Sequence, residues 1–413
     1  EHVLNEQLEK LVDAINNNTK AYAIPLLYGQ EIQKAFQLRA AGLGLLSNLS
    51  GDKKGVTCIE DTAVRIKDLS NYIAEFTKLL RSYDQEAVYY AHAGAGELHL
   101  RPILDLKKKE DVIDFRNLTK DVATLVKKYN GSLSGEHGDG IVRGSLIQDM
   151  IGEQNFNIIK KIKTLFDPNN IMNPGKIVNA FPMDEQLRYE VDRSEPKIET
   201  FFDFSSEDGI LKAIEKCNGS GDCRKSVEAG GTMCPSFQAT KDEKDSTRGR
   251  ANVFREVLTH STKANRFNSD TLREVLDLCL SCKACKSECP SNVDMATFKA
   301  EFQFQYQEAN GYTKRNQFIA KSTAYNEKAR KFLSISNFLL SNTFTSSYIK
   351  SYLGFAQERS LPKLSKQTLR SWLNENIQEL NPTKAIPEIV LFVDEFTDQL
   401  EAHIGIKAVK LLT

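Results

Sequence analysis

The sequence has no excess of either charge and no long apolar run. Its 413 residues contain 55 Lys plus Arg and 55 Asp plus Glu, so the formal net charge is zero. This balance excludes a strongly basic nucleic-acid binder and an acidic disordered chain. No apolar run approaches the roughly 18 residues of a membrane-spanning helix, and no signal-peptide pattern follows Glu1. The length predicts two to three globular domains.

The sequence also lacks the dense cysteine content of a disulfide scaffold. Of its eight cysteines, Cys58 stands alone and the other seven lie between residues 217 and 289. We predict that Cys58 is a small buried hydrophobe. The run Cys279-x2-Cys282-x2-Cys285-x3-Cys289-Pro290 is typical of iron–sulfur proteins. In such runs three thiolates bind one cluster, and the cysteine before the proline binds the other.

An upstream run, Cys217-x5-Cys223-x10-Cys234-Pro235, also ends in Cys-Pro. We therefore assign one [4Fe–4S] cluster to Cys234, Cys279, Cys282 and Cys285. The second cluster would use Cys217, Cys223 and Cys289, and it is one thiolate short. Either a non-cysteine group such as Asp222 completes it, or it is a [3Fe–4S] cluster. Structural zinc is the alternative for the whole set, but the gaps of 2, 2 and 3 before a proline favour iron–sulfur.

Histidine is scarce, with six residues in the chain, and three of them fall in two short glycine-rich segments. His92 and His99 flank a flexible turn, and Glu136 and His137 follow each other in a loop of glycines. Two histidines and a carboxylate can hold a divalent metal with open positions for a substrate. Glu136 could then face the metal while His137 acts as a base. Taken singly, each histidine is more often a structural residue, but the histidines, the carboxylate and the glycines together favour a functional site.

Hydrophobic periodicity predicts helices over 1–20, 69–81, 110–129 and 153–166, two strand-like runs within 88–104, and a glycine-rich loop over 131–144. A polar, acidic linker follows over about 183–200. The cysteine-rich region and residues 311–380 are predicted to be helical. The segment from Ser246 to Arg250 indicates a helix start beside the clusters. The two arginines of this segment could offset the negative charge of the clusters. An apolar run over 389–393 predicts a buried strand, and 394–404 a helix, as in an α/β unit.

Four segments, residues 59–64, 92–102, 131–140 and 167–176, together resemble the C-terminal half of the FAD-linked oxidases of the vanillyl-alcohol oxidase superfamily. The branch resembled is that of the D-2-hydroxy-acid dehydrogenases, such as D-lactate and D-2-hydroxyglutarate dehydrogenases. Residues 205–300 resemble the α-helical ferredoxin domain that is fused to some of these oxidases. Residues 388–413 resemble the beginning of the cysteine-rich reductase domain of the long fused members.

The resemblance implies an α+β fold, with a ferredoxin-like antiparallel sheet and helices followed by an all-α bis-cluster ferredoxin domain. The expected parts are an oxidase C-terminal domain over 1–182, a linker over 183–204, the ferredoxin domain over 205–310, a helical extension over 311–387 and a truncated α/β reductase domain over 388–413. This family places most of its FAD-binding domain ahead of these segments. Because no G-x-G-x-x-G loop occurs, we expect a central fragment that does not bind FAD tightly alone.

The resemblance also implies roles for individual residues. The metal (Zn, Mn or Fe) would be held by His92, His99 and Glu136, and His137 would be the general base. Arg39 would bind the substrate carboxylate. A turn containing Asn173 and Lys176 would pack near the flavin. One departure stands between the histidines, where many members have Gly-Asp-Gly-Asn. This chain has Gly-Ala-Gly-Glu, so Glu97 is a candidate replacement for that Asn.

The implied reaction is the oxidation of a small D-2-hydroxy acid, such as D-lactate or glycolate, by hydride transfer to FAD. Electrons would then pass to the two clusters and on to a quinone or a redox protein. A cytoplasmic location is expected, with or without attachment to the inner membrane through a partner, and no nucleic acid is expected. Two alternatives stay open, a non-enzymatic electron-transfer module with a structural metal site and a metal enzyme without flavin.

Overall fold

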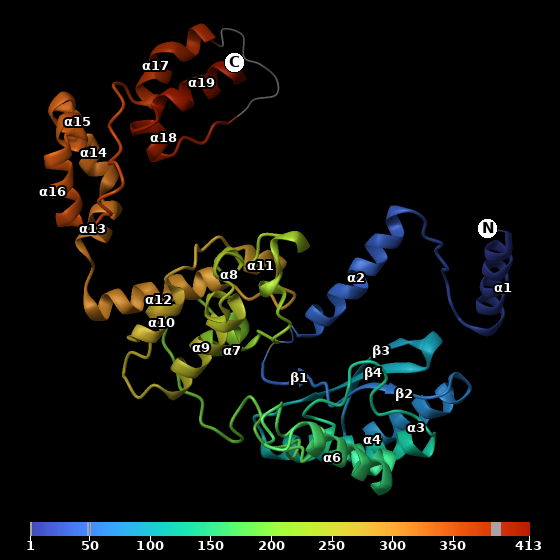
Figure 1. The fold of residues 1–413 in the computed structure, drawn as a ribbon. Helices are drawn as coiled ribbons and strands as arrows, with labels where there is room; N and C mark the ends of the chain where they lie inside the picture. The colour runs from blue at the N-terminus through green and yellow to red at the C-terminus, as the bar shows by residue number, and fades with distance from the viewer. Residues whose placement is uncertain (1, 48, 50, 381–389) are drawn as a thin grey trace. The chain divides into compact units, whose positions relative to one another are not determined.

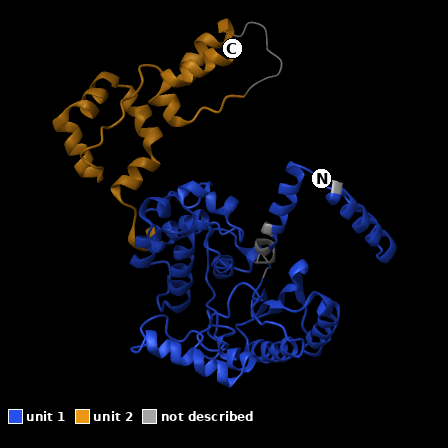
Figure 2. Cartoon of the chain, turned by 45° about the vertical axis from the view of Figure 1, so that its right-hand side comes forward, with its two compact units in different colours: residues 1–305 blue, residues 306–413 orange. Residues whose placement is uncertain are grey.

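The computed structural model describes residues 2–47, 49, 51–380 and 390–413. The chain divides into two compact units, residues 1–305 and 306–413, and each is described by itself (Figures 1 and 2). The first unit contains a small sheet with its helices and a purely helical region. In its described residues, the second unit consists of helices and irregular connections.

The chain begins with two helices, α1 (His2–Asn18) and α2 (Gln30–Ser47). The predicted helix over 1–20 is therefore confirmed. Its apolar side is not buried, since Val3 and Leu4 are each 70% exposed and Leu11 is 57% exposed.

An antiparallel sheet forms the centre of the first part of this unit. Its strands are β1 (Lys54–Gly55), β2 (Ile59–Ala63), β3 (Ala87–His92) and β4 (Glu97–Leu104). Strand β4 pairs with all three others, with Lys54 opposite Leu104, Ile59 opposite Leu100, and Ala87 opposite Pro102. The two predicted strand-like runs are thus β3 and β4. The turn between them needs Gly96, because a Cβ there would lie 2.0 Å from the Val64 carbonyl oxygen.

Helices α3 (Leu69–Ser82) and α4 (Lys109–Lys128) pack on one face of this sheet (Figure 1). Buried side chains of both helices and of the strands form one apolar cluster, including Phe76, Leu118 and Leu100. Cys58 is a fully buried member of this cluster. Burial raises the pKa of its thiol to about 11, so the prediction of a small buried hydrophobe is confirmed.

The glycine-rich loop runs back along the sheet edge and leads to α5 (Ile147–Ile151) and α6 (Glu153–Phe166). Ser132 forms an isolated antiparallel bridge with Ala63, and the N–H of Gly135 donates to the Asp61 carbonyl oxygen at 2.7 Å. The loop is therefore attached to β2 by its backbone.

The cysteine-rich region is all helical, as predicted. Its helices are α7 (Ile210–Glu215), α8 (Pro235–Thr240), α9 (Thr247–His260), α10 (Asp270–Leu276), α11 (Ala284–Glu288) and α12 (Met295–Asn310). Ser246 caps α9, since its hydroxyl accepts the N–H of Gly249. The predicted helix start at this segment is confirmed.

A buried lysine joins the sheet region to α7. The Lys107 ammonium, which follows β4, contacts the carboxylates of Asp52 at 2.8 Å, Glu215 at 2.7 Å, and Glu195. Burial opposes its charged form, but the hydrogen bonds to these carboxylates raise the pKa of Lys107 above its usual value. Arg193 of the linker also pairs with Glu215 at 2.9 Å.

The second unit contains α13 (Lys314–Ala320), α14 (Ser322–Arg330), α15 (Leu333–Ser341), α16 (Thr343–Leu353), α17 (Leu369–Leu380), α18 (Glu395–Gln399) and α19 (Ala402–Leu412). The predicted strand over 389–393 is wrong for the described residues 390–393, which are irregular. Val390 is 88% exposed and Phe392 86% exposed. A short apolar run forms a strand only beside another strand, and the described part of this unit offers none. Ile389 lies outside the described residues. The helix predicted over 394–404 is interrupted, since α18 ends at Gln399.

Candidate functional site

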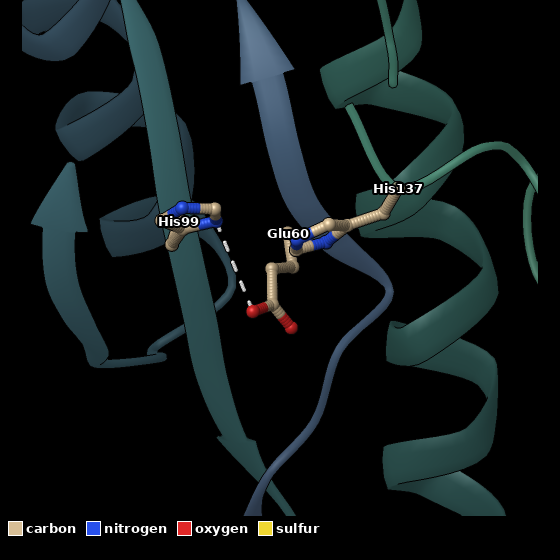
Figure 3. A group of neighbouring side chains, drawn as sticks. All are labelled: Glu60, His99 and His137. Atoms are coloured by element: carbon tan, nitrogen blue, oxygen red, sulfur yellow. Dashed lines mark ion pairs between the residues drawn. The ribbon is translucent and has the colours of Figure 1, made fainter. Parts of the chain in front are cut away.

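The face of the sheet opposite α3 and α4 carries a row of polar side chains. In the strand register, Glu60 of β2 and Tyr90 of β3 both lie opposite His99 of β4. Side chains two residues apart on a strand point to the same face, so His92 and Glu97 share this face. Figure 3 shows Glu60 and His99 side by side, with His137 reaching them from the glycine-rich loop.

The three predicted metal ligands lie together. One ligand atom each from His92, His99 and Glu136 lies within 4.8 Å of the other two, and we call this set the metal triad. His92 Nε2 lies 3.4 Å from Glu136 Oε1. Burial lowers the pKa of His99, so its imidazole is neutral, which is the form that binds a metal.

The chemistry of this donor set fits a divalent cation. His99 is only 3% exposed, and its Nδ1 has no hydrogen-bond partner among the described residues. A buried polar atom without a partner is costly unless something absent from the protein itself completes it. Two imidazoles and one carboxylate leave coordination positions open for a substrate.

The predicted base and the predicted carboxylate-binding arginine lie beside the triad. The His137 ring stacks on the His99 ring with centroids 5.4 Å apart, and its Nε2 lies 3.4 Å from Glu136 Oε1. Arg39 of α2 places Nη2 3.4 Å from His92 Nδ1. Five residues predicted from separate segments are therefore brought to one place.

The predicted flavin-side residues do not join this group. Asn173 adopts a positive φ of 50°. The adjacent turn packs against the ring of Phe181, because a Cβ at Gly175 would lie 2.0 Å from this ring. Among the described interactions, neither Asn173 nor Lys176 forms a side-chain hydrogen bond or ion pair with the metal triad.

Sequence reasoning missed the role of Asp61. This fully buried residue sits in a bulge of β2 with a φ of 83°. Its carboxylate accepts the N–H of Glu136 at 3.0 Å, the N–H of His137 at 2.8 Å and the hydroxyl of Ser134 at 2.7 Å. It thus fixes the backbone of the loop that supplies one metal ligand and the base. The only sequence signal is an acidic residue inside an otherwise strand-like segment.

Glu97 meets Asp61 beneath the loop. A hydrogen bond to Asp61, then burial and the charge of Glu136, raise the pKa of Glu97 to about 7. Burial alone would raise the pKa of Asp61, but hydrogen bonds from Glu97, Ser134 and the loop amides lower it well below its usual value. Below about pH 7, Glu97 is therefore the protonated partner of an ionised Asp61. Gly135 lies tightly above them, because a Cβ there would lie 3.1 Å from Glu97 Cδ.

Glu60 is a second acidic residue that sequence reasoning did not assign. Arg101 Nη2 binds its carboxylate oxygens at 2.6 Å each, and the Tyr90 hydroxyl donates to Oε1 at 2.9 Å. Oε1 also lies 3.8 Å from His99 Nδ1. The ion pair between Arg101 and Glu60 thus holds a carboxylate close to the His99 imidazole.

The four cysteines assigned to the first cluster line one cavity. They are Cys234, Cys279, Cys282 and Cys285, and we call them the first cysteine site. Cys234 directly precedes α8 and Cys285 lies in α11. The Glu288 carboxylate, another unpredicted feature, accepts the N–H groups of Thr232 at 2.9 Å and Met233 at 3.0 Å. It thereby holds the segment before Cys234 against α11.

The remaining three cysteines, Cys217, Cys223 and Cys289, are called the second cysteine site. Burial raises the pKa values of the Cys223 and Cys289 thiols, and the nearby Cys217 adds to both shifts. Asp222 raises the pKa of Cys289 further. The predicted non-cysteine candidate therefore lies close enough to this site to act on it electrostatically.

Comparison with known proteins agrees with both regions. Residues 1–177 match the family described as FAD linked oxidases, C-terminal domain, and residues 216–294 match the family described as 4Fe-4S dicluster domain. No described helix is long and apolar enough to cross a membrane.

Several curated relatives are similar over most of the chain. A D-2-hydroxyglutarate dehydrogenase of Haemophilus influenzae is 30% identical over 97% of this chain and 42% of its own length. One of Pantoea ananatis is 28% identical over 92% of this chain and 41% of its own length. A D-lactate dehydrogenase of Archaeoglobus fulgidus is 35% identical over 31% of this chain and 28% of its own length. The chain spans about two fifths of the first two relatives. It carries an FAD linked oxidase C-terminal domain followed by a 4Fe-4S dicluster domain.

Proposed function

We propose that this chain forms the substrate-binding and electron-transferring part of a flavin-dependent D-2-hydroxy-acid dehydrogenase. The observation that carries the proposal is the convergence of His92, His99 and Glu136 within 4.8 Å, next to His137. The relatives' names support the substrate class, since they include D-2-hydroxyglutarate and D-lactate dehydrogenases.

Each residue has a distinct task in this proposal. The metal triad would hold a divalent cation (Zn, Mn or Fe), which supplies Lewis acidity toward an α-hydroxyl group. Arg39 binds the substrate carboxylate through charge-assisted hydrogen bonds. His137 takes the hydroxyl proton, and Asp61 positions it by accepting its backbone N–H at 2.8 Å. The exposed turn with Asn173 and Lys176 is proposed to face the flavin.

The cysteine sites receive the electrons in this proposal. The first cysteine site would hold a [4Fe–4S] cluster through four thiolates. The second cysteine site supplies three thiolates, and either Asp222 completes it or a three-iron cluster forms there. We further propose a quinone or a redox protein as the final acceptor, and a reducing compartment that keeps these thiols from forming disulfides.

The test is His137→Ala in protein that also contains the expected FAD-binding domain and is loaded with FAD, assayed anaerobically by dye reduction with D-2-hydroxyglutarate, D-lactate and glycolate. We expect the active substrate to lose at least a hundredfold in rate, since a general base contributes about 10²–10⁴-fold. The control is His260→Ala, because His260 lies exposed on α9, where it pairs with Glu256. Unchanged turnover in His137→Ala would contradict the proposal and favour a non-enzymatic electron-transfer module.

A further inference from the structure

The first turn of α9 contacts both cysteine sites. The backbone N–H of Arg248 donates to Cys223 Sγ at 3.3 Å, and Arg250 Nη1 donates to Cys234 Sγ at 3.5 Å. Cys223 belongs to the second cysteine site and Cys234 to the first. The two arginines are therefore placed to act on different clusters.

The guanidinium of Arg250 is completely buried. Its Nε donates to the Val275 carbonyl oxygen at 2.7 Å and its Nη1 to Ser236 Oγ at 3.0 Å. Its Nη2 lies 3.5 Å from Asp245 Oδ1 but has no hydrogen-bond acceptor among the described residues. Arg250 also lines the cavity of the first cysteine site. A buried cation with an unfilled donor favours an anionic group in that cavity.

The charge of Arg248 is used differently. Its Nε and Nη2 bind the Glu243 carboxylate at 2.8 and 3.1 Å, and its side chain is 25% exposed. Its charge is thus balanced locally and screened by water. Arg248 contributes a backbone N–H to the second cysteine site, and its charge acts on Cys217 and Cys223 only alongside this pairing and screening.

Other charges near the two sites add to this difference. The Lys299 ammonium donates to the carbonyl oxygen of Cys279, in the first cysteine site, at 2.6 Å. The carboxylate of Asp222 acts on Cys289 of the second cysteine site. The carboxylate of Asp294 acts on Cys285 of the first site in the same way. Lysines pair with both carboxylates, Lys283 and Lys286 with Asp294 and Lys225 with Asp222. The cations Arg250 and Lys299 near the first site therefore make the difference between the two sites.

We propose that Arg250 raises the reduction potential of the cluster in the first cysteine site above that of the second, which makes the first site the electron-accepting end of the pair. Reduction adds one negative charge, and a desolvated guanidinium stabilises that charge more than a screened one. One electron then leaves the second cluster, which is oxidised, and reduces the first. The inference rests on the proposed function, because it requires clusters at the assigned cysteines.

The surroundings of the two sites agree with this order. The carbonyl oxygen of Cys217 accepts Arg188 Nη1 from the segment that follows the oxidase domain. Two residues earlier, Glu215 pairs with Lys107 of the sheet region at 2.7 Å. The second site thus adjoins the oxidase domain, while Cys282 of the first site is exposed.

The experiment is a redox titration of the cluster-containing protein, followed by electron paramagnetic resonance. In Arg250→Gln we expect the higher midpoint potential to fall by about 59 mV or more, a tenfold change in a one-electron equilibrium, with the lower midpoint unchanged. Arg250→Lys should restore most of the shift. Asp245→Asn should raise the higher midpoint, because it removes the counter-charge of Arg250. Arg255→Gln is the control, since Arg255 lies on the same helix and pairs with Glu256 at 2.7 Å.

Iron and sulfide are measured first in every variant. A protein without iron–sulfur clusters would overturn the cluster assignment itself. Two clusters with unmoved midpoints in Arg250→Gln, or a shift of the lower midpoint alone, would overturn only this inference. A fall in both Arg250→Gln and Asp245→Asn would indicate structural damage instead of charge and would also overturn it. If Arg250→Gln loses its iron, Arg250→Lys and Asp245→Asn decide the outcome.

Discussion

The buried carboxylate of Asp61 accepts the backbone N–H of His137 at 2.8 Å. It also accepts the N–H of Glu136 at 3.0 Å. The proposed base and one proposed metal ligand are thus held through their backbones by a single carboxylate on a neighbouring strand. The geometry of the proposed metal site depends on this contact, because a site loses metal affinity when the groups that orient its ligating residues are removed.

Asp61→Asn should loosen the glycine-rich loop. The neutral amide has one acceptor oxygen with two lone pairs, whereas the loop presents three donors, the N–H groups of Glu136 and His137 and the hydroxyl of Ser134. At least one of these donors loses its partner, at a cost of about 1–3 kcal/mol in unfolding free energy. Metal affinity should fall about 10–100-fold. Denaturant unfolding and metal titration measure the two effects. Asp68→Asn is the matched control, since Asp68 pairs with the exposed Arg65. Metal affinity equal to wild type in Asp61→Asn would contradict the positioning role.

Gly135→Ala should disturb the site by steric contact alone. The new Cβ would lie 3.1 Å from Glu97 Cδ and 3.3 Å from Asp61 Oδ1, so the two carboxylates would have to shift slightly away from it. We expect a loss of about 1–3 kcal/mol in stability together with weaker metal binding. Gly94→Ala should be tolerated, because nothing lies within 4 Å of a Cβ there. Equal thermal stability of both variants would show that Gly135 is not constrained as described.

Glu97 should make the stability of the metal-free protein depend on pH. Its pKa is raised to about 7, whereas an unfolded Glu titrates near 4.3. Between these two pKa values Glu97 is protonated in the folded state and ionised in the unfolded state. The free energy of unfolding should therefore fall as pH rises, by up to about 1.4 kcal/mol per pH unit. In Glu97→Gln this dependence of stability on pH should vanish, while the side-chain amide still donates a hydrogen bond to Asp61. Unfolding measured from pH 4.5 to 8 with a chelator tests it, and an identical slope in both proteins would exclude Glu97 as the source.

Lys107→Met should weaken the connection between the sheet region and α7. The variant leaves three partly buried carboxylates, those of Asp52, Glu195 and Glu215, without their shared cation. Arg193 still pairs with Glu195 and Glu215, and Lys212 with Asp52, so we expect a cost below the about 3–5 kcal/mol of a fully buried pair. Limited proteolysis should then cut faster within residues 183–204. Lys108→Met is the neighbouring control, because the Lys108 side chain is 62% exposed. Equal cleavage of the two variants would contradict the role of Lys107 in connecting the sheet region to α7.

The sequence allowed the site residues to be predicted where a motif is local. His92 with His99, and Glu136 with His137, each lie in one glycine-rich segment, and the cysteines follow short spacings. Asp61 could not be found this way, because its role depends on a strand bulge with a positive φ. Glu60 and Arg101 meet only through strand pairing across 41 positions.

The same limit explains the error near the C-terminus. The apolar run over 389–393 has the composition of a buried strand, and composition does not show whether a partner strand exists. In the described residues Val390 and Phe392 are exposed, and Asp394 instead caps α18 through the N–H groups of Phe396 and Thr397.

The most direct test of the central claim is the reduction of the clusters by substrate. The anaerobic FAD-loaded protein is mixed with a D-2-hydroxy acid or its L enantiomer and frozen for electron paramagnetic resonance. We predict the signal of a reduced iron–sulfur cluster with the D enantiomer alone, and no such signal in His137→Ala even though dithionite still reduces its clusters. Equal signals from both enantiomers, or an undiminished signal in His137→Ala, would contradict the account.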